Sequence, residues 1–539
     1  MRRLRVLIWP VLVALLAPGT ALAAPGDPHV IYTANTYADG AVVLRTDPGS
    51  GSLVEISRNG PQGTLFAAPY DLAVEADGNL LVADMGTLCT PAQPRCANDG
   101  RIIRVDPITG RQTLLAGGAP LVDPAGLALA ANGDIYVADN YEADDGGAIF
   151  RVDRSSGAIK PIAEGGLLDL PFDLVVAGDG SLVVSNRTLP GACAPVLAGR
   201  LVRVQPGDGA QSLVSEGGLF SYPLGVALDR TGAIVFANEC GNPGLARVLP
   251  DATQGLVTTN NALDVLVTPE RLVLDPAGDF LVSDWSLADG DGGIVRVDSE
   301  TGTQSLVRQG ALFNHPMGIA AVVSRPPRAA LRAPSLVAAG DRVTFDASAS
   351  SDPEGLRLAY EWDLDGNGVY ELGTGAVPTA TRTPTRQGSF TVRVRVNDPH
   401  GGRAVAQGVV RVDGSTPRIT KLSSGSSVLG VGRPARRAKR PRSSRKLPPR
   451  STKLRFKLSE AADVKVMIQR TGPGRRNPEP RELNRNGKAG ANSVQVVARG
   501  LRPGRYRLLV EATDAVGHAA TTRRLGLRVV NLAARRSPG

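Results

Sequence analysis

The sequence contains few of the residues and motifs from which catalytic sites are usually built. Its 539 residues include only four histidines, His29, His315, His400 and His518. It has no G-x-S-x-G nucleophile elbow, no H-E-x-x-H zinc motif and no Walker phosphate loop. These absences exclude the elbow hydrolases, the H-E-x-x-H metalloproteases and the P-loop nucleotidases as function classes.

Long apolar runs are missing after the N-terminus, so we expect no membrane span. The segment Met1–Ala23 has Arg2, Arg3 and Arg5, then a short apolar run that contains Pro10, then Ala-Leu-Ala. This order of basic, apolar and small residues predicts a secretory signal peptide rather than a membrane anchor. We therefore expect a secreted protein that is extracellular or associated with the cell surface.

Each end of the chain is poor in charge of one sign. Residues 415–539 contain 30 basic but only 6 acidic side chains, whereas residues 24–325 contain 18 basic and 35 acidic ones. Residues 326–414 have 10 of each. The formal net charge of +10 thus combines three modules of different charge, and this asymmetry predicts different partners for them.

A repeated unit fills the first three-fifths of the chain, and its clearest copy is Pro69–Leu115. Short apolar runs between Gly, Asp and Pro predict four strands there, at Asp71–Val74, Leu80–Ala83, Arg101–Val105 and Gln112–Leu115. Four antiparallel strands in a unit of roughly 45 residues is the pattern of one β-propeller blade.

The number of copies predicts six blades. The unit opens with a proline at Pro69, Pro124, Pro171, Pro223, Pro269 and Pro316. The last first strand, Gly318–Val323, has no second strand after it, and Val30–Ala34 is a second strand with no first strand before it. We therefore expect the two ends to complete one blade together, since ring closure removes open sheet edges.

The repeat P-x-[DG]-[LI]-A-[VL]-x-x-x-G-x-[LI]-x-V-A-[DN], followed by G-x-I-x-R-V-D, resembles the NHL-repeat and gluconolactonase-type six-bladed propellers. The resemblance covers roughly residues 28–324 and implies a propeller domain at residues 25–324. It says little about function, because this fold serves lactonases, binding scaffolds and signalling ectodomains alike.

Gluconolactonase-like enzymes carry acidic and Asn metal ligands at the central channel, so the resemblance implies oxygen ligands beside the repeat prolines. The residues that follow these prolines are Tyr70, Ala125, Phe172, Leu224, Glu270 and Met317. Only Glu270 among them offers a carboxylate, and a hard divalent cation needs several oxygen ligands. We therefore expect no metal cofactor in the propeller and no metal-dependent lactonase activity.

The next position around the ring holds Asp71, Gly126, Asp173, Gly225, Arg271 and Gly318. We predict that Asp71, Asp173 and Arg271 converge near the channel mouth. Together with Glu270 and His315 they form the candidate ligand-binding set. The alternative is structural: the three charged residues cap turns or pair with one another, and His315 only accompanies a turn.

All four cysteines, Cys89, Cys96, Cys193 and Cys240, fall in loops between a second and a third strand. In an exported protein they predict two disulfides out of three possible pairings. Since Cys89 and Cys96 share a loop, and Cys193 and Cys240 belong to adjacent blades, we predict those two pairs. The spacings lack a C-x-x-C pair, which disfavours a zinc site.

Residues 326–414 contain FDASASSDP and YEWDLDGNG and resemble the PKD domain, a small immunoglobulin-like sandwich of extracellular proteins. In that resemblance Trp362 is the core anchor. Asp363, Asp365 and Asn367 also imitate the start of a calcium loop. Thr374 stands where such a loop requires Glu, so calcium is only a candidate ligand at these residues.

Residues 415–530 alternate apolar and polar positions and resemble, more loosely, immunoglobulin-like or fibronectin-like repeats of secreted bacterial proteins. A basic segment at 432–451 and the tail 531–539 are predicted to be disordered. The candidate polyanion-binding residues are Arg433, Arg436, Arg437, Lys439, Arg440, Arg442, Arg445 and Lys446. Because no aromatics are interleaved with them, we expect an anionic cell-envelope polymer and no nucleic acid. Contact with the acidic propeller and plain solvation are the alternatives.

The sequence thus predicts an all-β chain, with a six-bladed β-propeller followed by two immunoglobulin-like β-sandwich domains. We expect a secreted binding or adhesion-type protein whose propeller offers a face to an extracellular glycan or protein. The sandwich domains then act as spacer and as attachment to the cell envelope. The alternative function is a carbohydrate- or sugar-lactone-processing hydrolase or lyase on a gluconolactonase-like propeller.

Overall fold

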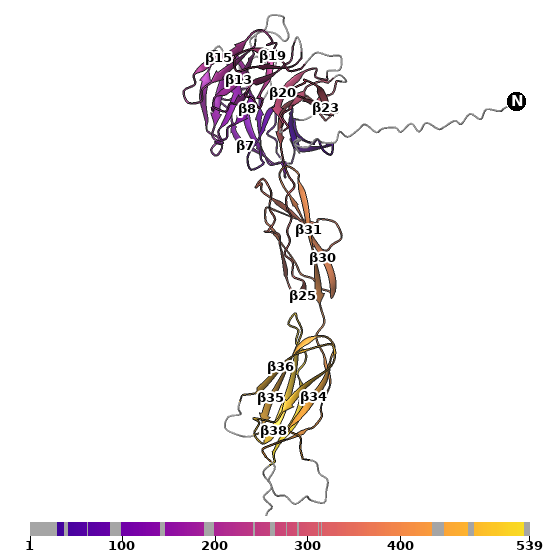
Figure 1. The fold of residues 1–539 in the computed structure, drawn as a ribbon. Helices are drawn as coiled ribbons and strands as arrows, with labels where there is room; N and C mark the ends of the chain where they lie inside the picture. Colours follow the sequence, from indigo (N-terminus) through magenta and orange to yellow (C-terminus); the bar gives the residue numbers. More distant parts are fainter. Residues whose placement is uncertain are drawn as a thin grey trace, which may run out of the picture. The chain divides into compact units, whose positions relative to one another are not determined.

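The computed structural model describes residues 30–36, 41–61, 63–86, 99–140, 146–187, 199–240, 243–258, 265–275, 277–287, 290–310, 312–313, 315–433, 447–472 and 479–532. All secondary-structure elements in these ranges are β-strands (Figure 1). Within the same ranges no helix is long and apolar enough to span a membrane. The predicted signal peptide lies outside the described residues.

The chain divides into two compact units. The first comprises residues up to 329 together with 350–360 and 396–404, and the second comprises residues 330–349, 361–395 and 405–539. Each unit is considered by itself.

The described residues between 30 and 322 form six four-stranded antiparallel sheets. Their strands are β1 (Val30–Asn35), β2 (Val42–Asp47), β3 (Ser52–Arg58), β4 (Pro69–Val74), β5 (Leu80–Asp84), β6 (Arg101–Val105), β7 (Gln112–Gly117), β8 (Pro124–Leu129), β9 (Ile135–Asp139), β10 (Ala148–Val152), β11 (Ile159–Glu164), β12 (Leu170–Val176), β13 (Leu182–Arg187), β14 (Arg200–Val204), β15 (Gln211–Glu216), β16 (Pro223–Leu228), β17 (Ile234–Asn238), β18 (Gly244–Val248), β19 (Gln254–Leu256), β20 (Pro269–Leu274), β21 (Phe280–Asp284), β22 (Gly293–Val297), β23 (Gln304–Gln309) and β24 (Pro316–Val322). Five of the sheets use four consecutive strands, from β4–β7 to β20–β23.

The sixth sheet joins the two ends of this region. Its order is β24-β1-β2-β3, and β24 pairs antiparallel with β1 so that Ile319 lies opposite Thr33. The predicted completion of one sheet by three N-terminal strands and one later strand is therefore confirmed. Without β24, strand β1 would be an unpaired edge.

The six sheets pack face to face around a common centre. The innermost strands contact one another in the order β4, β8, β12, β16, β20 and β24, and β24 returns to β4. Apolar side chains of neighbouring sheets form the cores between them, as Leu81 and Ile102 do with Val137 and Phe150. The middle strand β5 is therefore buried at every position, whereas the outer strand β7 is half exposed. This is a β-propeller.

Short polar side chains at the ends of the second strands hold the turns that precede the first strands. Oδ2 of Asp84 accepts a hydrogen bond from the Ala67 N–H at 2.8 Å. Asp139 and Asp284 make the equivalent bond, each at 2.8 Å, in their own sheets. These carboxylates satisfy backbone donors that are otherwise lost on burial.

The strands of residues 336–531 form two β-sandwiches. They are β25 (Leu336–Ala338), β26 (Val343–Asp346), β27 (Ala359–Asp363), β28 (Leu372–Gly375), β29 (Thr379–Arg382), β30 (Gly388–Asn397), β31 (Arg403–Asp413), β32 (Ile419–Ser424), β33 (Val428–Val431), β34 (Ser451–Leu458), β35 (Ala462–Thr471), β36 (Arg481–Gly487), β37 (Gly490–Val497), β38 (Gly504–Thr513) and β39 (Arg523–Asn531). The first sandwich has the sheets β25-β31-β30-β27-β28 and β26-β29, and the second has β32-β34-β37 and β33-β39-β38-β35-β36.

Each sandwich buries the residues expected from its alternating pattern. Trp362, the predicted anchor of the first sandwich, is fully buried, and its indole N–H donates to Oγ1 of Thr374 at 3.1 Å. In the second sandwich Phe456 from one sheet packs with Val466 and Leu508 from the other. The predicted all-β class is confirmed.

Candidate functional site at the centre and rim of the propeller

The residues that follow the repeat prolines form an apolar layer where the six sheets converge. Ala125, Phe172, Leu224 and Met317 come from four different innermost strands and belong to one buried cluster. Glu270 occupies the same position on β20 and is only 2% exposed. Its Oε2 has no hydrogen-bond partner among the described residues. An unpartnered carboxylate in such a layer is costly when charged.

One residue further along the innermost strands, glycines alternate with charged residues for a steric reason. A Cβ on Gly126 would lie 2.7 Å from Cα of Asp173, and a Cβ on Gly318 would lie 2.7 Å from Cα of Asp71. A Cβ on Gly225 would likewise lie 2.7 Å from Cα of Arg271. Each glycine therefore allows the backbone of a charged residue on the neighbouring strand to approach closely.

The three charged residues form a buried polar cluster at the centre. Oδ2 of Asp71 accepts from the Leu127 N–H, and Oδ2 of Asp173 accepts from the Val226 N–H, both at 2.8 Å. Each carboxylate thus binds the backbone of the next sheet. Arg271 extends across the centre instead.

Arg271 neutralises and crosslinks this cluster. Its Nη2 donates to the carbonyl oxygens of Ala125 at 2.9 Å and Phe172 at 3.1 Å, and its Nε lies 3.8 Å from Oδ2 of Asp173. The guanidinium also stacks over the Phe172 ring, 4.0 Å from the centroid. One cation therefore connects three sheets in a place that is 2% exposed.

Burial governs the protonation of these carboxyl groups. Desolvation, with a smaller contribution from Asp173, raises the pKa of Asp71 to about 7, and Arg271 opposes the shift. Burial also raises the pKa of Asp173, again against Arg271. For Glu270 desolvation raises the pKa to about 8, so this carboxyl group is mostly neutral at pH 7.

This shift predicts how propeller stability changes with pH. Because the pKa of Glu270 is about 8 in the folded state, against 4.5 for an ordinary glutamate, its contribution is fully present below pH 4.5 and is lost as pH rises through 8. We expect the unfolding free energy to fall by a few kcal/mol in total over this range, on the order of 1.4 kcal/mol per pH unit for one such group. Urea denaturation between pH 5 and pH 9 measures this slope.

Glu270→Gln should flatten the slope between pH 5 and pH 8, because Gln does not titrate. Asp179→Asn is the matched control, since hydrogen bonds from Ser181 lower rather than raise the pKa of this exposed carboxyl group. A slope between pH 5 and pH 8 that is the same in Glu270→Gln and in the unmodified chain would contradict the prediction.

A second group of side chains surrounds the apolar layer and is partly exposed. We call Arg187, Tyr222, Glu239, Trp285 and His315 the rim cluster; each is neither fully buried nor fully exposed. They come from the ends of β13, β17 and β21 and from the residues before β16 and β24. Aromatic rings and ionisable groups are therefore concentrated over four consecutive sheets.

Arg187 is the most constrained member of the rim cluster. Its guanidinium lies over the Phe172 ring at 4.2 Å and over the Tyr222 ring at 4.9 Å, and its Nη1 donates to the Tyr222 hydroxyl at 2.7 Å. When the Asn140 amide is oriented to satisfy its neighbours, its oxygen accepts from Nη2 of Arg187 at 3.1 Å. The cation is thus held in one orientation before any ligand arrives.

Two members of the rim cluster have strained backbones. Tyr222 and His315 immediately precede repeat prolines, and their φ angles are 62° and 57°. Left-handed φ is uncommon for residues other than Gly, and Asn, Asp and His adopt it more often than the others do, so the strain is clearer at Tyr222 than at His315. Such strain is concentrated at functional sites. The His315 ring packs edge-on against Trp285 with centroids 4.6 Å apart, and burial lowers the His315 pKa.

The structure separates the sequence candidates into two sets. It brings Asp71, Asp173 and Arg271 together and buries all three. They contact one another, as the structural alternative to ligand binding predicted. Glu270 lies in the apolar layer beside them, and His315 lies at the rim. A ligand-binding role for the buried three stays a prediction.

Sequence reasoning missed most of the rim cluster. Arg187, Glu239 and Trp285 each follow the Asn or Asp that ends a second strand. The equivalent residues elsewhere are Thr36, Met85 and Asn140, all buried. The sequence did contain one signal for the rim cluster: the residue after the second strand varies from sheet to sheet, whereas the rest of the repeat is regular.

The predicted calcium residues are used by the protein itself. Oδ1 of Asp363 accepts from the Gly366 N–H at 2.6 Å and Oδ2 from the Gly368 N–H at 2.9 Å. Arg393 also binds Oδ2 at 2.8 Å. Asp365 and Glu371 lie close enough to join Asp363 around a cation, but Asn367 instead caps the Val369 N–H at 2.7 Å. Backbone donors and Arg393 thus already satisfy the Asp363 carboxylate.

Other candidates fall partly or wholly outside the described residues. Cys89, Cys96 and Cys193 do, so both disulfide pairings stay predictions; Cys240 is buried and is not a free thiol. Of the basic segment, Arg433 is described and exposed. Arg436, Arg437, Lys439, Arg440, Arg442, Arg445 and Lys446 lie outside the described ranges.

Comparison with known proteins identifies one domain. Residues 324–412 match the PKD domain family. The first sandwich is a PKD domain. A search of curated proteins gave no match.

Solved structures align with about half of this chain at low identity. A nidogen–laminin complex is 12% identical over 54% of this chain and 97% of that chain, with a TM-score of 0.41. A gluconolactonase from Xanthomonas campestris is 15% identical over 53% and 88%, with a TM-score of 0.33. A protein of unknown function from Bacteroides caccae is 14% identical over 54% and 98%, with a TM-score of 0.39. Similarity at this level says nothing about what this chain binds.

Proposed function

We propose that this chain is a secreted multidomain binding protein whose propeller binds an extracellular carbohydrate through the rim cluster. The observation that carries the proposal is the preorganised, partly exposed group of aromatic and ionisable side chains over a closed centre. Aromatic surface with a few fixed polar groups is the usual composition of a small-ligand site.

The chemistry of the rim cluster suits a sugar. Tyr222 and Trp285 offer flat apolar faces for the C–H side of a pyranose ring. Arg187 donates in a fork and Glu239 accepts, which together match neighbouring hydroxyl groups. Burial raises the pKa of Glu239, with Arg187 opposing the shift, so this carboxyl group is sensitive to what covers it.

The closed centre favours shallow binding over a deep metal site. The apolar layer and the cluster around Arg271 fill the place where a lactonase would hold its cation. A ligand is therefore expected to lie across the rim, where residues from neighbouring sheets reach it at once. The PKD domain and the second sandwich then act as spacers, and the basic C-terminal module attaches the protein to an anionic polymer of the cell envelope.

Glycan-array screening of the full chain tests the proposal. We expect Arg187→Ala and Trp285→Ala each to weaken binding of any hit at least tenfold, as loss of a central anchor usually does. Arg203→Ala is the matched control, because Arg203 contacts Ser181 Oγ and Asp179, away from the rim cluster. Hits that survive both rim substitutions would place the ligand elsewhere.

A second candidate function rests on Glu270. A buried carboxyl group that is neutral at pH 7 can serve as a general acid, and Glu239 is close enough to raise its pKa. Such a pair would suit a hydrolase or lyase of carbohydrates. If that function holds, the chain should release product from a bound glycan and Glu270→Gln should bind it but turn over at least 100-fold more slowly. No product from the unmodified chain would rule this function out.

A further inference from the structure

The second sandwich carries four arginines on the outer face of its five-stranded sheet. Strand β38 buries Tyr506, Leu508 and Val510, so Arg505 and Arg507 point outward by the two-residue alternation of a strand. On β39 the same alternation directs Arg524, Gly526 and Arg528 outward. We call Arg505, Arg507, Arg524 and Arg528 the arginine groove.

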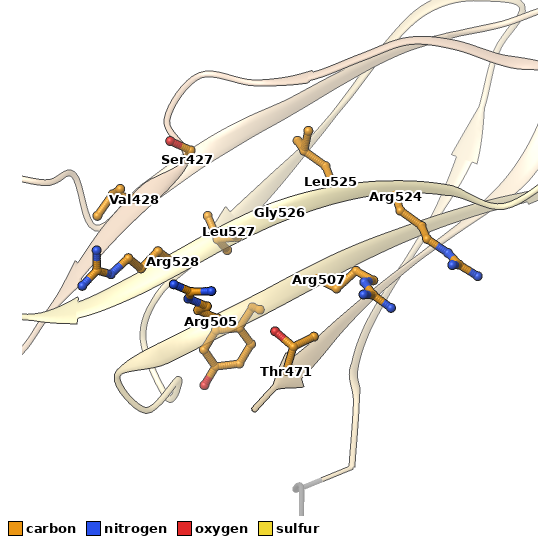
Figure 2. Close-up of a pocket in the computed structure, with 11 residues that line it drawn as sticks. Ser427, Val428, Thr471, Arg505, Arg507, Arg524, Leu525, Gly526, Leu527 and Arg528 are labelled. Carbon is orange, nitrogen blue, oxygen red and sulfur yellow. The ribbon is translucent and has the colours of Figure 1, made fainter. Parts of the chain in front are cut away.

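The strand register brings these arginines together around a hollow. Arg505 lies directly opposite Arg528, Arg507 lies opposite Gly526, and Arg524 lies opposite Leu509. Gly526 has open space where a Cβ would project. The side chains border a groove of about 540 Å³ that Ser427, Val428 and Thr471 complete. Figure 2 shows Arg505 with Arg528 at one end of the groove and Arg507 with Arg524 at the other.

This arrangement is unfavourable without a counter-charge. Like charges directly opposite one another on a sheet are destabilising, and none of the four arginines has a carboxylate within 4.0 Å in the part of the chain that the structure describes. The same sheet pairs Lys465 with Glu482 at 2.7 Å. The arginine groove therefore differs from Lys465, on the same sheet, in lacking an anion of its own.

The groove also borders the strand that leads to Arg433, the described member of the predicted polyanion-binding residues. Strand β33 pairs in parallel with β39, with Val428 beside Arg528. Strand β33 ends at Val431, two residues before the exposed Arg433. A chain-like ligand lying in the groove is thus in a position to continue toward Arg433.

We infer that the arginine groove is the binding site for an unbranched polymer that carries carboxylate or phosphate groups at short, regular intervals. Guanidinium groups bind both kinds of oxyanion in a two-pronged fashion. Outward residues two apart on a strand are about 7 Å apart, and opposite residues are about 5 Å apart, so four guanidiniums contact several neighbouring anions at once. The inference deepens the attachment role proposed above and rests on it.

The groove is not built for single-stranded nucleic acid. Grooves that bind single strands stack the bases on exposed aromatic rings. Tyr506, the aromatic residue at this groove, is 6% exposed, and its hydroxyl donates to the Arg502 carbonyl at 2.8 Å. Charge recognition without stacking favours a polymer that lacks bases.

Calorimetry on the full chain tests the site with polygalacturonate as the carboxylate probe and inorganic polyphosphate as the phosphate probe. One variant changes all four groove arginines to Gln. The control changes Lys421, Lys453, Arg455 and Lys457 to Gln, which removes the same charge from exposed positions of the other sheet. We expect the groove variant to bind each probe at least tenfold more weakly than the unmodified chain does, and the control variant less than threefold more weakly. The affinity should depend less steeply on salt concentration only in the groove variant.

The outcomes separate the site from the function on which it rests. If the unmodified chain binds neither probe at low salt, the attachment role itself is wrong. If the chain binds but both variants weaken equally, net charge is responsible and the arginine groove is not the site. The inference would also be wrong if the chain bound single-stranded DNA as tightly as the two probes. It would be wrong as well if deletion of residues 434–446 abolished binding while the groove variant bound like the unmodified chain.

Discussion

A chain that lacks residues 316–322 should fail to form a cooperative propeller. These residues are β24, which supplies the innermost strand of the sheet that closes the ring. Their loss exposes β1, which is buried at all six positions, and removes the buried Met317 and Ile319. We expect aggregation, or a thermal scan by calorimetry in which the propeller transition is absent.

Deletion of residues 434–440 is the matched control, because it removes the same number of residues outside the described strands. It should leave the propeller transition in place. A chain without β24 that retains the transition at its original midpoint would contradict the closure of the ring by β24 and β1.

Arg271→Met should lower the unfolding free energy of the propeller by about 3–5 kcal/mol, the usual cost of removing one partner from a buried ion pair. Met fills much of the same volume but leaves the Ala125 and Phe172 carbonyls without their donor. It also leaves Asp71 and Asp173 without a cation. Urea denaturation followed by far-ultraviolet circular dichroism measures the loss.

Two further variants keep this test specific. Arg203→Met, at a partly exposed ion pair with Asp179, should cost less than about 1 kcal/mol. Arg271→Met combined with Asp173→Asn should recover part of the loss, since the uncompensated carboxylate is then gone. Equal losses in Arg203→Met and Arg271→Met would show that the central cluster does not hold the propeller together.

The strands of the propeller could be predicted closely because their signals are local. The predicted strand Arg101–Val105 agrees with β6, and Leu80–Ala83 differs from β5 only by Asp84 at its end. Apolar alternation and turn residues lie within a few positions of each strand. The pairing of β1 with β24 was also predictable, since each end of the repeat was incomplete without the other.

The rim cluster could not be predicted in the same way because its contacts are long-range. Arg187 matters through the Phe172 ring and through Tyr222, which is 35 residues away. Arg271 reaches the Ala125 carbonyl across 146 residues. Proline and glycine spacing indicates where the innermost strands begin, but not which side chains meet across the ring. The alternation of glycine with Asp71, Asp173 and Arg271 was visible, whereas its steric cause was not.

The propeller as a carbohydrate-binding face is the central claim, and tryptophan fluorescence during titration with an array-identified glycan tests it most directly. The chain has three tryptophans: Trp9 in the predicted signal peptide, Trp362 buried in the PKD domain, and Trp285 at the rim. We expect a saturable change in emission that Trp285→Phe abolishes and that Arg187→Ala shifts to at least tenfold higher glycan concentration. Saturable binding by calorimetry with no change in Trp285 emission would contradict it.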